Sequence, residues 1–196
     1  MKQKLLAFFI ILVFTGCTAS GTPAAVIIPK VDPDGFLKQV DDRFVYNDWP
    51  LSLALPANWP IEKFSGEILA DAATRSTFVR DPLPEHENSP TLTISFHKIP
   101  PGFDAARYSI ALQRQQPVYF STIIKKQIED DRVGLKNSIF YITSHEIDGV
   151  EHTTYIVHAT SDDIGVEVIL EVDADSLKDV SQEFDDILGS LKFENQ

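Results

Sequence analysis

Two histidines, His145 and His152, stand at equal distances from an Asp-Gly pair and are the first residues that suggest chemistry. Asp148-Gly149 lies between runs rich in β-branched and aromatic residues, a pattern that predicts a two-residue hairpin turn. With that turn, the two histidines are cross-strand partners on one face, with Cβ atoms about 5 Å apart. At this spacing both rings could bind one metal ion, at about 2.1 Å per nitrogen.

The same pattern supplies no third ligand for such a metal. Glu146 and Glu151 point to the opposite face, and Thr143 and Thr154 are the neighbours on the shared face. A site with two ligands is weak, so the sequence favours a neutral histidine pair covered by a helix or loop. Protonating both rings is then unfavourable, and we expect stability to be lost between about pH 7 and 5. No cofactor is expected.

The motifs of common catalytic sites are absent from the chain. The sequence has no Gly-rich phosphate loop, no Gly-x-Ser-x-Gly elbow, no His-Glu-x-x-His motif and no pair of cysteines. Catalytic triads assemble from distant residues, so an enzyme stays an alternative. Nothing, however, selects a nucleophile or one carboxylate pair among the 29 acidic residues. The sequence therefore predicts a protein that is not an enzyme.

Cys17 is the one cysteine of the chain and ends a segment typical of export signals. Lys2 and Lys4 give this segment a positive start. Residues 5–14 are continuously apolar, which is too short for a membrane span of ~20 residues but suits a signal peptide. Phe14-Thr15-Gly16-Cys17 then resembles the lipobox of bacterial lipoproteins, in which the cysteine is acylated and becomes the mature N-terminus. Phe14 stands where that pattern usually has Leu.

Lipid attachment is the interpretation that fits Cys17 best. A disulfide lacks a second cysteine in the chain, and a catalytic thiolate needs a basic neighbour, whereas the next charged residue is Lys30. Two or three acyl chains on one residue anchor a protein stably. Thr18 follows the cysteine, and by resemblance to proteobacterial lipoproteins the absence of Asp there favours the outer over the inner membrane.

The acidic composition limits what this protein contacts. A formal net charge of −12 argues against nucleic-acid binding and against adhesion to anionic lipid headgroups, so the lipid must anchor the chain to the membrane. We expect residues 1–16 to be a signal peptide and residues 17–35, which are small and Pro-rich, to be a flexible tether spanning ~25 Å. Residues 36–196 can bury one core and form one domain.

The sequence of that domain predicts mainly β-strands, with two helices. Strands are expected at 51–55, 76–80, 91–99, 121–131, in a hairpin over 138–161, at 166–172 and at 191–193. The first helix follows Pro100-Pro101-Gly102, ends before Pro117 and should bury Phe103, Ala106, Ile110 and Ala111. The second helix should bury Leu177, Val180, Phe184, Ile187 and Leu188, with a cap at Asp175 or Ser176 and an end at Gly189.

The hairpin strand 138–147 decides the expected architecture. Phe140 and Ile142 lie on one face, and Ile139, Tyr141 and Ile147 lie on the other. A sheet that is apolar on both sides needs cover on both sides. The sequence therefore predicts an α+β fold, a three-layer α/β/α sandwich around a mainly antiparallel sheet.

Two short motifs connect this order of elements to a known family. The chain resembles the PsbP-like domain over about residues 44–193, through Pro56–Trp59 and the closing Gly189–Phe193. That family includes a lumenal subunit of photosystem II and bacterial periplasmic lipoproteins of the DcrB type. The resemblance implies an α/β/α sandwich that serves as an accessory or binding module at a membrane, without a shared active site.

Three functions remain open from the sequence. We expect a lipid-anchored, non-enzymatic accessory or binding protein of the bacterial cell envelope, facing the periplasm and acting through contacts with an envelope protein. One alternative is a module that binds a divalent metal or a small ligand. The other is an envelope hydrolase whose site carries no recognisable motif.

Overall fold

The structure is a computed structural model that describes residues 33–69, 73–84, 86, 88–115, 124–128 and 132–194. Its helices are α1 (Pro33–Phe36), α2 (Ala105–Gln115) and α4 (Leu177–Ser190), with short 3-10 turns at Ile61–Lys63 and Ala174–Ser176. Its strands are β1 (Leu37–Val40), β2 (Arg43–Tyr46), β3 (Leu51–Leu53), β4 (Ser65–Ile68), β5 (Thr74–Val79), β6 (Thr91–Lys98), β7 (Ile124–Ile128), β8 (Ser138–Ile147), β9 (Val150–Ser161), β10 (Ile164–Asp173) and β11 (Lys192–Phe193).

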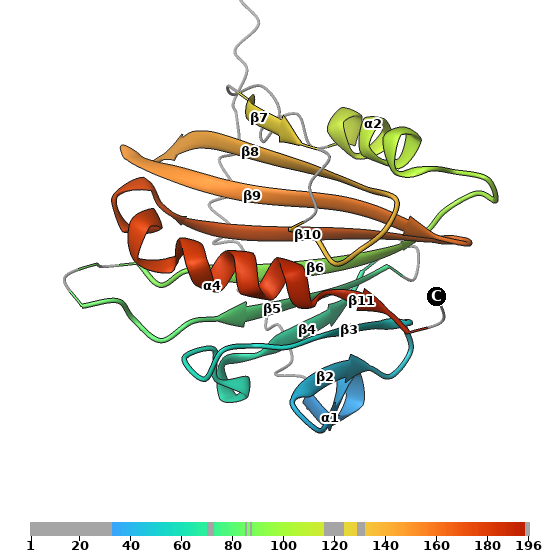
Figure 1. Cartoon of the computed structure of the whole chain (residues 1–196), viewed down its shortest axis with the longest axis horizontal. Coiled ribbons are helices and arrows are strands. Elements are labelled where there is room, and N and C mark those ends of the chain that lie inside the picture. Colours follow the sequence, from blue (N-terminus) through green and yellow to red (C-terminus); the bar gives the residue numbers. More distant parts are fainter. Residues whose placement is uncertain are drawn as a thin grey trace, which may run out of the picture.

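These strands form two antiparallel sheets, so the predicted α+β class is confirmed. The large sheet has the order β4-β5-β6-β10-β9-β8-β7, and the small one has the order β1-β2-β3-β11 (Figure 1). The small sheet was not predicted as a separate unit. The expected strand at 191–193 exists as β11, and it pairs with β3 of the small sheet.

Two tight turns set the register at the centre of the large sheet. Asp148 and Gly149 both have positive φ, 50° and 84°, as a two-residue type I′ hairpin requires. Asp162, with φ 53°, begins the turn between β9 and β10. The predicted hairpin is therefore confirmed, and His145 is indeed the cross-strand partner of His152.

One face of the large sheet carries the main apolar core. Leu92, Ile94 and Phe96 alternate along β6 as predicted and are fully buried on this face. The small sheet and α4 cover the face, and Figure 1 shows α4 lying across the middle of the large sheet. Aromatic rings fill the layer between them, with Trp49 stacked on Phe96 at 5.0 Å. Burial of these apolar side chains drives the folding of this side of the molecule.

Helix α4 follows the predicted stripe but ends later than expected. Val180, Phe184, Ile187 and Leu188 are buried. Ser176 is the N-cap but makes no side-chain capping hydrogen bond, and the helix continues past Gly189 to Ser190. The helix ends there because Leu191 has extended dihedrals and leads directly into β11. The expected N-cap position is therefore confirmed at Ser176, without a side-chain capping hydrogen bond, whereas the expected end at Gly189 was wrong.

Helix α2 lies on the other face of the large sheet, and its predicted buried side was wrong. It buries Ala105, Tyr108, Ser109 and Leu112, whereas Ile110 is 50% exposed. Phe103 precedes the helix and packs against the small cluster of Ile99, Tyr108 and Leu112. The prediction followed apolar residues alone, but Tyr108 and Ser109 face inward because they form hydrogen bonds with polar side chains of the sheet.

Different elements thus pack on the two faces of the large sheet. Core residues of α4 and the small sheet occupy one face, whereas α2 contacts β8 and β9 from the other. These contacts are compatible with a sandwich. A complete three-layer α/β/α arrangement stays a prediction, and the additional four-stranded sheet was not part of it.

Candidate functional site

A row of polar side chains crosses the α2 face of the large sheet. Cross-strand pairing brings together one residue each from β9, β10, β6, β5 and β4: His158, Glu167, Ser95, Arg75 and Glu67. The first three are buried, and Arg75 binds Glu67 at the edge of the sheet, 3.2 Å apart. Burying a carboxylate and an imidazole is unfavourable unless they are paired. The buried side chains of Glu167 and His158 therefore need hydrogen-bonding partners.

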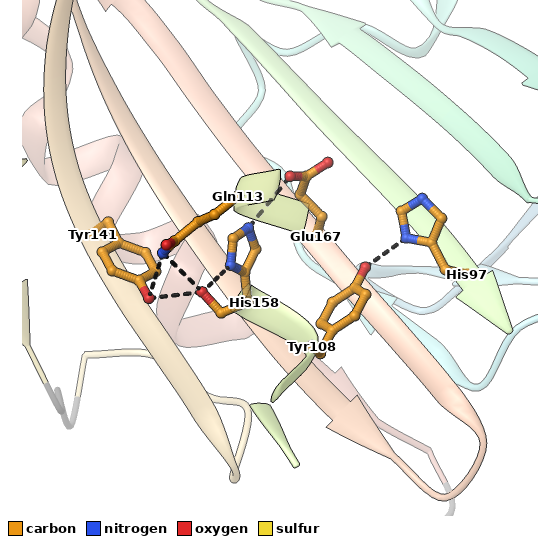
Figure 2. A network of polar contacts seen from close by, with 7 residues as sticks. His97, Tyr108, Gln113, Tyr141, His158 and Glu167 are labelled. Atoms are coloured by element: carbon orange, nitrogen blue, oxygen red, sulfur yellow. Dashed lines mark hydrogen bonds and ion pairs between the residues drawn. The ribbon is translucent and has the colours of Figure 1, made fainter. Parts of the chain in front are cut away.

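His158 lies at the centre of a hydrogen-bonded network beneath α2 (Figure 2). Its Nε2 is 3.3 Å from Glu167 Oε1, and its Nδ1 is 2.9 Å from Ser109 Oγ. Tyr141 Oη is 2.7 Å from the same serine oxygen. Gln113 Nε2 donates to both Ser109 and Tyr141. Three strands and one helix thus meet in a single chain of contacts.

One assignment of protons satisfies this chain. Tyr141 donates to Ser109, Ser109 donates to Nδ1 of His158, and Nε2–H of His158 donates to Glu167. Every hydroxyl and both ring nitrogens then have a partner. The network fixes α2 against the sheet, because Ser109 supplies the link from the helix.

The residue types in this network are those of a nucleophile, a base and an acid. A serine, a histidine and a glutamate in contact resemble the parts of a hydrolytic triad. However, Ser109, His158 and Glu167 are only 1%, 0% and 2% exposed. Ser109 also lies within α2, whose backbone N–H groups are used inside the helix. The arrangement therefore supports a positioning role better than acyl transfer, since a substrate cannot reach the serine.

A second polar contact lies beside this network. Nδ1 of His97 on β6 is 2.5 Å from Tyr108 Oη on α2. Burial lowers the pKa of His97, which outweighs the opposing effect of the Glu167 carboxylate, so the ring is neutral at neutral pH. Burial also raises the pKa of Tyr108, which keeps its hydroxyl protonated.

Gly165 allows the Tyr108 ring to approach the sheet. A Cβ atom at this position would lie 2.5 Å from the tyrosine ring, closer than real Cβ contacts. Gly165 is the first residue of β10 on the α2 face of the sheet, and it is the cross-strand partner of His97. The glycine therefore creates the space in which Tyr108 reaches His97.

A cleft of about 270 Å³ opens next to the His97–Tyr108 contact. It lies between α2 and the end of β6, and its walls are mostly apolar: Ala73, Ile99, Pro100, Phe103, Ala111 and Leu112. The ring of His97 and the side chains of Tyr108 and Gln115 supply its polar lining together with Lys98. Small-molecule sites combine apolar walls with a few placed polar groups in this way. The cleft was not predicted from the sequence, although Phe103 and Ala111, which were expected to be buried, lie in its wall.

The predicted histidine pair lies at the far end of the same sheet face. The rings of His145 and His152 are stacked, with centroids 5.6 Å apart. Glu171 Oε1 and Asp173 Oδ1 lie 3.5 and 3.6 Å from Nδ1 of His152, and Glu171 Oε2 is 3.8 Å from Nε2 of His145. These carboxylates come from β10 and were missed. Counting residues across the Asp162-Asp163 turn would have found them, because His152 pairs with Asp173.

The structure changes what is expected of this pair. Among the residues that it describes, no group of three or more His, Cys, Asp or Glu is arranged to hold a metal ion. The metal interpretation of His145 and His152 therefore gains no support. Glu171 and Asp173 face the two rings, which the sequence did not lead us to expect. The loss of stability expected on acidification stays a prediction.

The predicted lipidation site cannot be placed next to these features. Cys17 lies outside the described residues, as do the predicted signal peptide and most of the predicted tether. In the parts that are described, no helix has both the length and the apolar character that crossing a bilayer requires.

Comparisons with known proteins identify no family for the chain. No protein-family model and no curated protein matches it. LpqN, described as involved in cell envelope biogenesis of Mycobacterium tuberculosis, has a similar structure with 13% sequence identity and a TM-score of 0.48. That match covers 72% of this chain and 82% of LpqN. Similarity at this level transfers no function.

A structure from Bacteroides thetaiotaomicron gives a comparable match. Its sequence identity is 13% and its TM-score is 0.46, over 78% of this chain. The match covers 48% of the other protein, so this chain spans about half of its length. Neither match tests the resemblance to the PsbP-like domain, which stays a prediction.

Proposed function

We propose that this chain is a lipid-anchored, non-enzymatic accessory protein of the bacterial cell envelope. The observation that carries the proposal is the N-terminal sequence, in which a positive start and an apolar run end at Phe14–Cys17. The lipid on Cys17 is the anchor, residues 17–35 are the tether, and residues 36–196 are one PsbP-like domain. The protein faces the periplasm, at the outer rather than the inner membrane.

Two features of the folded part support a role without catalysis. The Ser109–His158–Glu167 contact is buried, so its nucleophile is inaccessible. The exposed large apolar residues are spread over several elements and include Ile147 and Val150, a cross-strand pair at the tip of the β8–β9 hairpin. This pair is exposed at a hairpin tip, where another protein can reach it, but it is smaller than the patches of several hundred Å² that mark contact surfaces. The partner in this proposal is an envelope protein.

The anchor is tested by replacing Cys17 in the full chain. In cells fed an alkyne-labelled fatty acid, the wild type should carry the label and enter the detergent phase, whereas Cys17→Ala should lose both properties. Ser20→Ala, three residues downstream, is the matched control and should behave as wild type. An unlabelled wild-type protein in the aqueous phase would contradict the proposal.

A further inference from the structure

We propose that the cleft between α2 and β6 binds a small, uncharged and mainly apolar molecule through one hydrogen bond from Nε2–H of His97. The ligand class is a short aliphatic chain with a carbonyl or ester oxygen. This binding site goes beyond the accessory role proposed above and does not depend on the lipid at Cys17.

The hydroxyl of Tyr108 determines which ring nitrogen of His97 carries the proton. Tyr108 is buried, and among the described residues His97 Nδ1 is the one acceptor within reach of its hydroxyl. A buried hydroxyl needs an acceptor, so Tyr108 donates to Nδ1. A neutral imidazole carries one proton, and in His97 that proton is therefore on Nε2.

The resulting N–H group is available to a ligand. His97 is half-buried and lines the cleft. No side chain in the described part of the chain accepts a hydrogen bond from its Nε2. The ring is held by Tyr108, and Tyr108 is held by the close approach that Gly165 permits. A donor that is fixed before binding loses little entropy when the ligand arrives.

The cleft favours an uncharged acceptor over an anion. His97 is neutral there, and the ammonium group of Lys98 is already engaged: it lies 3.1 Å from Asp163 Oδ2 and 5.6 Å from the centroid of the Trp49 ring. A carboxylate ligand would lose its hydration without gaining an available cation. An ester or ketone needs only one donor. Its aliphatic part would contact Ile99, Phe103 and Leu112.

The volume sets the size of the ligand. About 270 Å³ lies just below the range of roughly 300–1,000 Å³ that is usual for drug-sized ligands. A chain of about six carbons with a small head group is therefore the appropriate probe.

The test compares three fluorinated probes that share one chain: methyl 6,6,6-trifluorohexanoate, the corresponding carboxylate and 1,1,1-trifluorohexane. The full chain is held in lipid nanodiscs, and binding is followed by ¹⁹F NMR against empty nanodiscs, which corrects for partition into lipid. We expect the ester to bind more tightly than either of the other probes. Equal binding of ester and alkane, or tighter binding of the carboxylate, would overturn the proposal.

Two substitutions on α2 locate the binding site. Ala111→Phe places a ring in the cleft and should abolish binding of the ester. Ala106→Phe is the matched control, because Ala106 is exposed and does not line the cleft; it should leave binding unchanged. Binding that survives Ala111→Phe would place the ligand elsewhere and reject the site.

The hydrogen bond is tested with His97→Asn, whose side-chain oxygen can replace Nδ1 as the acceptor for Tyr108 while the Nε2 donor is lost. This variant should weaken ester binding about fivefold, as expected for one hydrogen bond, and leave alkane binding unchanged. An equal loss for both probes would show that His97 acts by shape alone. In the wild type, ¹⁵N NMR of the ring should find the proton on Nε2, and a proton on Nδ1 would also refute the mechanism.

Discussion

The two faces of the large sheet bury different kinds of side chain. On the α4 face, successive strands contribute fully buried apolar residues such as Phe78, Ile94 and Val168, and α4 and the small sheet pack on them. On the α2 face, His158 and Glu167 are buried in hydrogen bonds next to a small apolar cluster of Tyr141, Ile156 and Ile169. The comparison separates two roles: the apolar face stabilises the fold, whereas the polar face positions α2 and the cleft beside it.

The largest effect is expected from truncating a ring on the apolar face. Phe184 is fully buried and contacts the rings of Tyr155 and Trp59, with centroids 5.5 and 6.3 Å away. Phe184→Ala should lower the free energy of unfolding by about 3–5 kcal/mol, measured by urea denaturation. Ile110→Ala, on the exposed side of α2, is the control and should change it by less than about 0.5 kcal/mol. A loss below about 1 kcal/mol for Phe184→Ala would show that α4 is not docked in the core.

On the polar face, the free energy of unfolding should depend on whether each buried polar side chain keeps its partner rather than on the volume that a substitution removes. His158→Leu removes the partner of the buried Glu167 and should cost about 3 kcal/mol. Adding Glu167→Leu removes the orphaned carboxylate, so the double variant should be more stable than His158→Leu alone. A double-mutant cycle by urea denaturation measures this coupling. Costs that simply add would show that the two side chains are not coupled, and the comparison between the faces would fail.

An ion pair formed by Glu183, in the middle of α4, makes the stability of the apolar side depend on pH. Both nitrogens of the Arg80 fork bind Glu183 at 2.8 Å, and Asn58 and Trp59 also donate to this carboxylate. Burial alone would raise the pKa of Glu183, but these hydrogen bonds outweigh it and hold the pKa below its usual value of 4.5. The depressed pKa means that its stabilisation is present above pH 4.5 and is lost as the pH falls through the folded-state value.

Glu183→Gln should therefore lower stability by about 2 kcal/mol at pH 7. The difference between this variant and the wild type should shrink below about pH 4.5. Urea midpoints measured from pH 7 to pH 3 check this, with the exposed Glu146→Gln as the control. A difference that stays constant over this range would show that the carboxylate does not titrate as described.

Local sequence patterns predicted the apolar face well. The stripe of α4, the alternation along β6 and the Asp148-Gly149 turn each depend on residues close in sequence. The strands β1 and β2 were missed because they are only four residues long and mostly not buried, so no alternation marks them.

The polar face was harder to predict because its pairs join residues from different strands. His158 contacts Glu167 only because the Asp162-Asp163 turn fixes the register of β9 and β10. The pairing of His158 with Glu167 could have been predicted from the sequence by counting residues from the turn. The contact of Ser109 with His158 was not, since it depends on which side of α2 faces the sheet. An amphipathic pattern cannot identify a helix face that is buried against polar groups.

Native-state hydrogen exchange in low concentrations of urea tests the central comparison most directly. Helix α4 packs in the main core, whereas the apolar contacts of α2 are the small cluster of Ile99, Tyr108, Leu112 and Phe103. We therefore predict that the Phe184 amide exchanges through global unfolding, with a strong dependence on urea. The Leu112 amide should exchange through a local opening of lower free energy that depends little on urea. The same free energy and the same urea dependence for both amides would contradict the account.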